Sequence, residues 1–333
     1  MRKLLVLLVS LICLSSSTWA DSEWSLGEAH FLRGQTQTKI PYEIWDNRIL
    51  VQIPVNDSTP LTFVLDTGGS NIMSREAAEA LHLKTTAGPE IHGAGPKAVT
   101  SQRAKVDKYV LGDLMLTHQS FLILDLNEIR TASGFPRLDG LIGYELLHLA
   151  AVRIDPKEKT LTLTDFAAFQ PPAGVAPIKM EKTNGMPVIA GLINGQPARY
   201  SLDTGDRFSL TLMQKFARIS HFDKLFEGAP SAYSGMGFGG AIAGRTTPLS
   251  QVRLGPTFEI KNVLARLTCA NGGYFATGDV TANVGNEILR RFTLTMDYRR
   301  RQLYLQPNAS IDDPYRVVPL KVSPAMIAPK SEP

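Results

Sequence analysis

The residues best suited to chemistry form a tripeptide, Asp-Thr-Gly, that occurs twice, at residues 66–68 and 203–205. Each copy ends a short, mostly apolar segment with the length and composition of a strand. Such a strand holds the carboxylate at its end rigidly, and the glycine lets the backbone turn sharply where another segment comes close. One copy alone would be a weak motif, because turns favour these three residue types anyway. Two copies make Asp66 and Asp203 candidate catalytic residues.

The two copies belong to a longer internal repeat. Five landmarks recur in the same order at offsets of 137 to 143 residues: 63–68 with 200–205, 93–95 with 235–237, 110–112 with 253–255, 140–147 with 282–289, and 154–163 with 296–305. A nearly constant offset over five landmarks indicates two copies of one fold. The two aspartates therefore occupy equivalent positions in the two copies.

Two carboxylates related by such a repeat can lie side by side. Like charges at that range cannot both ionise, so the pair is expected to share one proton at neutral or acidic pH. The ionised member can take a proton from water while the protonated member polarises a carbonyl group. The expected chemistry is general acid–base hydrolysis, without a metal ion, a covalent intermediate or a cofactor.

The elements around the candidate residues are predicted to be mainly strands. Residues 48–53 and 61–65 form a hairpin across the turn at residues 56–60. A helix is expected over residues 74–81, with Ser74 as its N-cap, and its repeat partner covers residues 212–219. A short helix at residues 144–150, a turn at 155–159 with a strand at 160–164, and a hairpin turn at 299–301 complete the expectation.

On these motifs the chain resembles the aspartic peptidases of the pepsin/retropepsin superfamily, and is most similar to exported bacterial aspartyl protease-like proteins. The resemblance covers roughly residues 40–306 and includes an apolar-apolar-Gly motif downstream of each Asp-Thr-Gly, at residues 141–143 and 283–285. It implies an all-β, bilobal acid-protease fold with few short helices. It also implies a peptide or protein substrate and a catalytic dyad of Asp66 and Asp203.

The resemblance assigns supporting roles as well. Thr67 and Thr204 are expected to lock the two loops together through hydroxyl-to-backbone hydrogen bonds, with Gly68 and Gly205 beside them. The two later glycine motifs are expected to pack behind the loops. The substrate-binding flaps fall near residues 93–95 and 235–237, which include the glycines Gly93, Gly95, Gly235 and Gly237.

Three departures from the family pattern stand out. Asp206 follows the second Asp-Thr-Gly, where pepsin-like enzymes have Ser or Thr. Ionised, it is expected to raise the apparent pKa values of the dyad and shift activity to less acidic pH, with Arg207 as its candidate counter-ion. The first flap, residues 91–96, lacks a tyrosine, and Asn283 opens the second apolar-apolar-Gly motif. The alternative hypothesis is therefore a catalytically inactive peptide-binding or scaffold protein on the same fold.

The first 20 residues have the pattern of a signal peptide. Arg2 and Lys3 precede an apolar run at residues 4–14, which is too short to span a bilayer, and Ala20 closes a small-residue cleavage site. A periplasmic or secreted protein, cleaved after Ala20, is expected. The lobes are predicted at residues 21–168 and 178–306, joined by a proline-rich linker at 169–177 and followed by a tail at 307–333.

The remaining signals are weaker. The formal net charge is +4, and it falls to +2 without Arg2 and Lys3, so a nucleic-acid partner is not expected. No later segment is long and apolar enough for membrane insertion, and a monomer is expected.

Residues 235–240 match the residue pattern of a dinucleotide-binding fingerprint, but no helix is predicted after them, as that fingerprint requires. Cys269 is expected to be a buried thiol. A second alternative is a pair of independent β-domains whose aspartates never meet.

Overall fold

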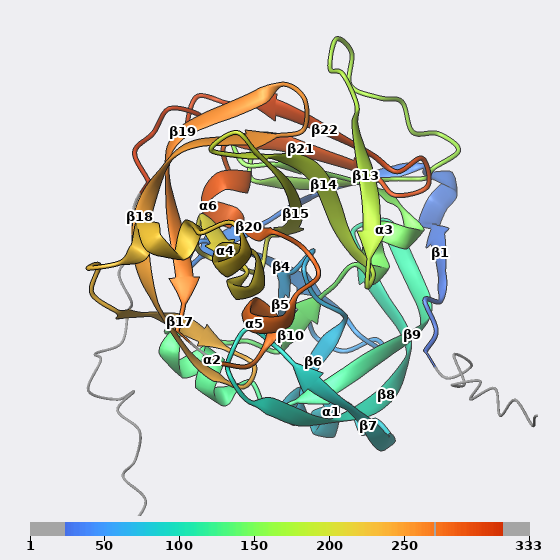
Figure 1. The fold of residues 1–333 in the computed structure, drawn as a ribbon. Coiled ribbons are helices and arrows are strands. Elements are labelled where there is room, and N and C mark those ends of the chain that lie inside the picture. The colour runs from blue at the N-terminus through green and yellow to red at the C-terminus, as the bar shows by residue number, and fades with distance from the viewer. Residues whose placement is uncertain (1–23, 270, 316–333) are drawn as a thin grey trace, which may run out of the picture.

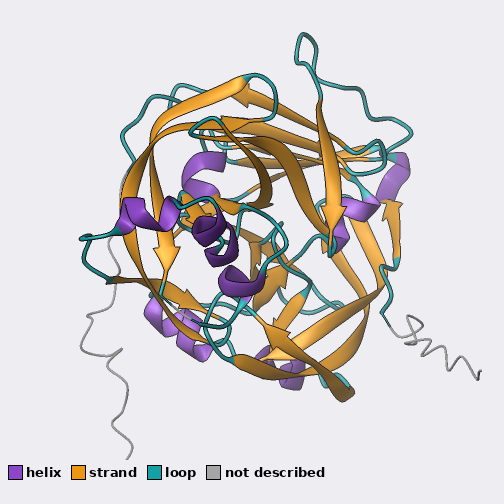
Figure 2. Cartoon of the chain, in the orientation of Figure 1, coloured by secondary structure: helices purple, strands orange, loops and turns teal. Residues whose placement is uncertain are grey.

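The computed structural model describes residues 24–269 and 271–315, and it is built mainly of strands with short helices at their ends (Figure 2). The predicted leader at residues 1–20 lies outside the described residues. The first copy of the repeat, drawn blue to green, fills the lower right of Figure 1, and the second copy, drawn yellow to red, fills the upper left. The predicted all-β, bilobal fold class is confirmed.

The first lobe is a sheet whose strands run in the order β3-β4-β5-β10-β6-β9-β8-β7, with β1 beside β9. Its central strands β5 and β10 are parallel, as are β6 and β9. The strands are β1 (Glu28–Phe31), β3 (Glu43–Trp45), β4 (Arg48–Ile53), β5 (Leu61–Leu65), β6 (Ile72–Ser74), β7 (Thr85–His92), β8 (Ala98–Leu111), β9 (Leu114–Leu124) and β10 (Gly140–Ile142). The predicted hairpin of residues 48–53 and 61–65 is therefore present as β4 and β5.

The second lobe repeats the order of the seven strands from β4 to β7 in this sheet, and its strands β14 and β18 also pair with each other. Its order is β14-β15-β20-β16-β19-β18-β17, and the pairs β15–β20 and β16–β19 are again parallel. The strands are β14 (Met186–Ile193), β15 (Gln196–Asp203), β16 (Leu210–Leu212), β17 (Ala232–Gly237), β18 (Gly240–Leu254), β19 (Phe258–Thr268) and β20 (Ala282–Gly285). The internal repeat of the sequence is thus also a repeat of the structure. Residues at equivalent positions of the two lobes can therefore be compared directly.

A set of antiparallel strands joins the two lobes. Strand β11 of the first lobe pairs with β21 of the second, and both stand within one continuous sheet. The strands of this joining part are β2 (Gln37–Pro41), β11 (Ala151–Asp155), β12 (Thr160–Thr164), β13 (Ile178–Thr183), β21 (Phe292–Asp297) and β22 (Gln302–Pro307). The three arginines at residues 299–301 form the turn between β21 and β22, as predicted. The joining sheet fixes the two lobes relative to each other through the pairing of β11 with β21.

The helices are short, and the three predicted ones are present as α1 (Arg75–Ala80), α3 (Glu145–Leu149) and α4 (Gln214–Ile219). Helix α4 begins two residues later than predicted, because residues 210–212 form strand β16. Helix α1 starts after Ser74, whose hydroxyl accepts a hydrogen bond from the Ala77 amide at 3.0 Å, so the predicted N-cap is confirmed. The helical segments that the sequence did not predict are η2 (Leu32–Gly34), α2 (Asn127–Ala132), η3 (Phe222–Phe226), α5 (Tyr274–Thr277) and α6 (Asn286–Leu289). No helix of the described residues has the length and apolar character needed to cross a membrane.

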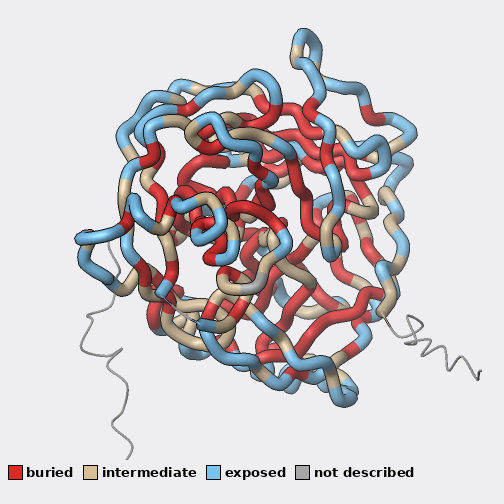
Figure 3. The backbone as a smooth tube through the Cα atoms, viewed as in Figure 1, coloured by how far each residue is buried: buried red, intermediate tan, exposed pale blue. Residues whose placement is uncertain are grey.

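One apolar core runs through both lobes, and the buried backbone forms a continuous centre in Figure 3. A separate apolar cluster lies on the other face of the first-lobe sheet and includes Leu50, Val64, Ile72, Leu122 and Leu141. Because side chains alternate across a strand, the neighbouring residues Phe63 and Leu65 belong to the main core. The first-lobe strand that ends at Asp66 is therefore buried on both faces.

A buried carboxyl group supports the loop after Asp66. Glu145, at the start of α3, is fully buried and accepts a hydrogen bond from the Asn71 amide at 2.9 Å. The Asn71 side chain in turn accepts one from the Gly143 amide at 2.9 Å. At the equivalent position of the second lobe, Glu287 makes ion pairs with Arg290 and Arg291. Burial raises the pKa of Glu145 to about 8.

We expect Glu145 to make the protein less stable as the pH rises from about 4.5 to about 8. The folded state keeps the Glu145 proton through this range, whereas the unfolded chain releases it. The variant Glu145→Gln keeps the oxygen that accepts from Asn71 and removes the titration. Its free energy of unfolding, measured by denaturant titration, should therefore fall less than that of the parent between pH 5 and pH 8, by a few kcal/mol at most, on the order set by the raised pKa.

The exposed Glu79 serves as the control for this measurement. Glu79→Gln should leave the pH dependence of stability as it is in the parent. Equal pH dependence in Glu145→Gln and the parent would show that Glu145 is already ionised in the folded protein.

Candidate active site

The two Asp-Thr-Gly loops interlock through their threonines. The Thr67 hydroxyl donates to the Leu202 carbonyl at 2.7 Å and accepts from the Thr204 amide at 3.1 Å. The Thr204 hydroxyl makes the mirror-image pair, donating to the Leu65 carbonyl at 2.7 Å and accepting from the Thr67 amide at 3.1 Å. Both threonines are 1% exposed, so none of these four bonds competes with water.

This interlock brings the two carboxyl groups together. Asp66 and Asp203 lie within hydrogen-bonding range of each other, so the alternative of two unconnected β-domains is wrong. Each carboxyl also accepts from the glycine amide of its own loop, Gly68 at 3.0 Å and Gly205 at 2.9 Å. A Cβ atom on either glycine would stand 2.4 Å from the carboxyl carbon of the opposite aspartate. Only glycine allows this approach.

Burial and mutual repulsion decide how the pair ionises. Burial raises the pKa of both carboxyls, and a negative charge on either one opposes ionisation of the other. The second ionisation is therefore strongly disfavoured, while a single negative charge is shared and hydrogen-bonded. The geometry provides what hydrolysis by this chemistry requires, one carboxylate beside one carboxylic acid.

The two apolar-apolar-Gly motifs lie directly behind the loops. The Asp66 amide donates to the Ile142 carbonyl at 2.8 Å, and the Gly285 amide donates to the Ser209 carbonyl at 2.8 Å. A Cβ atom on Gly143 would stand 2.3 Å from the Gly69 carbonyl oxygen. The ends of strands β10 and β20 therefore pack against the aspartate loops and restrain the loop backbones through hydrogen bonds and close contacts.

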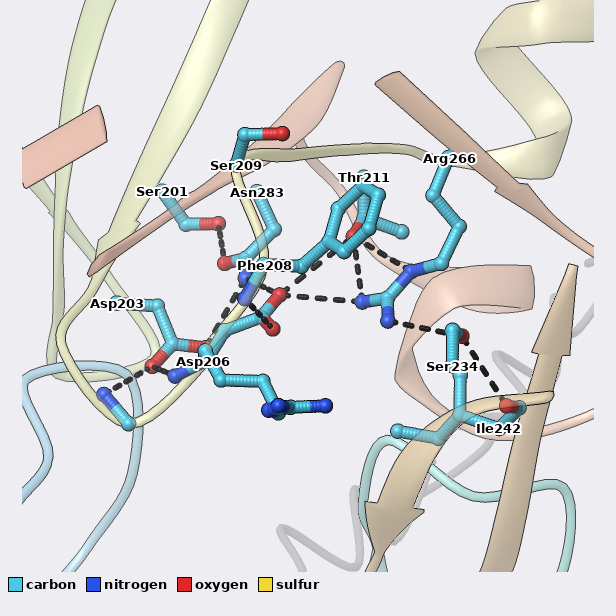
Figure 4. Close-up of polar contacts among 12 residues, drawn as sticks. Ser201, Asp203, Asp206, Phe208, Ser209, Thr211, Ser234, Ile242, Arg266 and Asn283 are labelled. Carbon is cyan, nitrogen blue, oxygen red and sulfur yellow. Dashed lines mark hydrogen bonds and ion pairs between the residues drawn. The ribbon is translucent and has the colours of Figure 1, made fainter. Parts of the chain in front are cut away.

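Asp206 lies in a buried polar network and not at the surface (Figure 4). Its side chain is 11% exposed, and its carboxylate pairs with the buried Arg266 at 3.2 Å. Arg207, the expected counter-ion, makes its ion pair with Asp46 at 2.7 Å and interacts with Asp206 as a nearby charge. The partner Arg266 lies 60 residues along the chain, on β19, where the parallel pairing of β16 and β19 brings it to the loop.

Arg48 is a second buried arginine that sequence reasoning missed. It pairs with Asp46 and donates from Nε to the Gly205 carbonyl at 2.7 Å, across the lobe boundary. Its charge lowers the pKa of Asp66. An arginine at the start of a strand carries no sequence signal for such a role, since its partner is 157 residues away.

The candidate flaps form two hairpins that meet each other. Gly93 and Gly95 lie in the turn between β7 and β8, whereas Gly235 and Gly237 lie within β17, just before the tip of the β17–β18 hairpin. The two tips are joined by hydrogen bonds from the Gly95 amide to the Phe238 carbonyl at 2.8 Å and from the Lys97 amide to the Gly239 carbonyl at 3.0 Å. Access of a peptide to the dyad therefore requires these bonds to open.

Each flap tip also packs on the opposite lobe. Phe238 contacts the apolar first-lobe cluster around Val64, and Ala94 contacts a second-lobe cluster that includes Met213 and Phe275. The Tyr274 amide, at the start of α5, donates to the Gly93 carbonyl at 2.8 Å. The missing flap tyrosine is thus not replaced within the flap, and a backbone contact from the other lobe holds the first tip.

Cys269 is exposed, contrary to the expectation of a buried thiol. Strand β19 ends at Thr268, so Cys269 already stands in the loop, with its sulfur 3.4 Å from the Ser231 hydroxyl. The surrounding sequence contains no signal that distinguishes the last buried strand residue from the first loop residue.

Comparison with known proteins gives one family match, over the first lobe. Residues 51–146 match the model of a family of aspartyl proteases. A comparison with curated proteins found no match. Among solved structures, a retropepsin-like aspartic protease from Rickettsia conorii is 20% identical, with 42% of this chain and 95% of that chain covered and a TM-score of 0.29. Basic 7S globulin from soybean is 11% identical, with 86% and 99% covered and a TM-score of 0.47.

The match to the family model spans the first Asp-Thr-Gly loop, and the structure repeats that loop in the second lobe. The resemblance to aspartyl proteases is confirmed over residues 51–146.

Removing one threonine hydroxyl should destabilise the protein. Thr204→Val keeps the side-chain shape but leaves the Leu65 carbonyl and the Thr67 amide without their partner, at a cost of about 1–3 kcal/mol. Thr67→Val should cost a similar amount, and the double variant should cost less than the sum, because both residues belong to one network. Chemical denaturation measures all three.

Thr204→Ser is the matched control, since it retains the hydroxyl. If Thr204→Val unfolded at the same denaturant concentration as Thr204→Ser and the parent, the interlock would contribute nothing to stability.

Proposed function

We propose that this protein is an exported aspartic endopeptidase that hydrolyses peptide bonds with a water molecule activated between Asp66 and Asp203. The observation that carries the proposal is the contact between the two carboxyl groups, held by reciprocal threonine bonds on two copies of one loop. The match of residues 51–146 to aspartyl proteases supports it.

The proposed reaction has two steps. The ionised aspartate takes a proton from water while the protonated aspartate donates its proton to the peptide carbonyl oxygen, and the water oxygen bonds to the carbonyl carbon. The resulting tetrahedral intermediate breaks its carbon–nitrogen bond as one carboxyl protonates the leaving amine and the other recovers a proton from a hydroxyl. The dyad ends with one proton, as it began.

Two features of the sequence favour a non-catalytic scaffold, Asp206 and the flap without tyrosine, and the contacts of Asp206 weaken the first of them. The charge of Asp206 is paired with that of Arg266, so it does not stand as an isolated third charge beside the dyad. The flap without tyrosine remains, but both hairpins and the α5 segment meet above the site. We expect a peptide to enter when the hydrogen bonds between the two tips open, and to bind in extended form between the tips and the dyad.

Replacement of either aspartate should abolish hydrolysis and leave the fold intact. An amide in Asp66→Asn or Asp203→Asn can neither take a proton from water nor share an ionisable one. We expect at least a thousandfold loss of kcat in each single variant and little further loss in the double variant, because the two residues act as a unit.

The assay is hydrolysis of a mixed peptide library over pH 3–8, with and without a transition-state-analogue inhibitor of aspartic peptidases. Turnover near that of the parent in either variant would remove the dyad from the mechanism. Inhibitor binding without any hydrolysis by the parent would favour the scaffold alternative.

Export is the part of the proposal that rests on sequence alone, through the charged start, the apolar run and the cleavage site at residues 18–20. The mature protein should begin at Asp21. Expression of the full chain in a bacterium, followed by fractionation and mass measurement of the intact protein, checks this. A cytoplasmic product that still carries residues 1–20 contradicts it.

A further inference from the structure

The internal repeat offers a position-by-position comparison of the two walls beside the dyad. The strand registers pair Val64 with Leu141, Ile72 with Leu141 and Ile72 with Leu122 in the first lobe. The same registers in the second lobe pair Ser201 with Asn283, Thr211 with Asn283 and Thr211 with Arg266. Four apolar residues of one lobe are thus four polar residues of the other, and Gly69 corresponds to Asp206.

This difference changes how each aspartate is hydrogen-bonded. Asp66 accepts from the Gly68 amide. Asp203 accepts from the Gly205 and Asp206 amides, both at 2.9 Å, and from the Asn283 side-chain amide at 3.0 Å. Hydrogen bonds donated to a carboxylate stabilise its charged form.

The orientation of the Asn283 amide is fixed by what surrounds it (Figure 4). Its oxygen accepts from the Ser201 hydroxyl at 2.7 Å, and its nitrogen donates to Asp203 and, at 3.1 Å, to Asp206. The opposite orientation would place an amide oxygen against two carboxylates. The Tyr274 hydroxyl donates to Ser201 at 3.2 Å and extends the network toward α5.

We propose that Asn283 is the positioning residue that fixes which aspartate carries the shared proton: it holds Asp203 ionised and leaves the proton on Asp66. In the proposed hydrolysis, on which this inference rests, Asp203 is then the base that accepts the proton of water. Asp66 is the acid that donates to the peptide carbonyl.

The charges nearest the second aspartate are arranged so that this assignment holds. Asp206 raises the pKa of both dyad members, and its pairing with Arg266 offsets that effect. Arg266 is held in place by Thr211, whose hydroxyl accepts from it at 2.7 Å, and by Ser234 on the flap strand β17 at 3.1 Å. The role of the Asp206–Arg266 pair is therefore to hold Asn283 without leaving a net charge beside Asp203.

The groups facing the first aspartate act less directly. Arg48 lowers the pKa of Asp66, but its charge is shared with Asp46, to which it is paired. Glu145 interacts with Asp66 and is neutral below about pH 8. Tyr274, which faces Asp203, has its pKa raised by burial to about 12 and stays neutral as well. A direct donor to Asp203 outweighs these partly balanced charges.

Carbon-13 NMR of aspartate-labelled full-length protein tests the assignment without any need for activity. Asp66→Asn leaves Asp203 as the sole titrating member, and Asp203→Asn leaves Asp66. We expect the pKa of the lone Asp203 to be lower than that of the lone Asp66 by at least about one pH unit. Asn283→Leu, which installs the first-lobe residue, should raise the pKa of the lone Asp203 by about one pH unit, the usual worth of a hydrogen bond to a charged group.

The matched control is Leu141→Ala, which disturbs packing at the equivalent position of the first lobe but removes no donor. It should leave the pKa of the lone Asp203 unchanged. If Asn283→Leu does not fold, Ser201→Ala frees the amide and should move the same pKa in the same direction by less. A lone Asp66 that titrates at or below the lone Asp203, or an Asp203 indifferent to Asn283→Leu and Ser201→Ala, overturns the proposal.

Kinetics with both aspartates present provide a second readout. Removal of the donor makes the first ionisation of the dyad harder, so the acidic limb of the kcat profile should move to higher pH in Asn283→Leu, with KM unchanged. The alkaline limb should stay, because the last proton leaves Asp66. A lower pKa for the lone Asp203 than for the lone Asp66, without any peptide hydrolysis, would support this inference and reject the proposed function. Peptide hydrolysis without this difference in pKa would support the proposed function and reject the inference.

Discussion

The structure depends on holding one negative charge between two buried carboxyl groups at the boundary of two lobes. Two like charges in contact repel, and a lone charge away from water is costly, so the arrangement is stable only with one shared proton and well-placed donors. The reciprocal threonine bonds and the two glycines that let the loops touch serve this one requirement. The parallel strand pairs β5–β10 and β15–β20 anchor the two aspartate loops in the cores of their lobes.

The surrounding buried charges obey the same constraint. Arg48 and Arg207 pair with Asp46, and Arg266 pairs with Asp206. Together the three guanidinium groups offset these two carboxylates and the single charge of the dyad. The neighbourhood is therefore neutral when the dyad holds one proton, and either the loss or the gain of a proton leaves an uncompensated buried charge.

The sequence allowed the repeat, the strand hairpin, the Ser74 cap and the pairing of the aspartates to be predicted, because each depends on local patterns or on the symmetry of the repeat. The partners of Asp206 and Arg48 could not be predicted in this way. Arg266 and Gly205 stand 60 and 157 residues from the groups they bind, and only the strand registers bring them there. The same reason explains why the ion pair of Asp206 is with Arg266, whereas its sequence neighbour Arg207 pairs with Asp46.

The repeat also shows where the two copies have ceased to be equivalent. Their strand order and registers are the same, yet Leu141 and Asn283 occupy one position of the fold with opposite chemistry. In a dyad of two identical halves, the shared proton has no preferred side before substrate binds. A single chain that contains both halves can place a donor beside one aspartate only, and so hold the acid and the base in position before the peptide arrives.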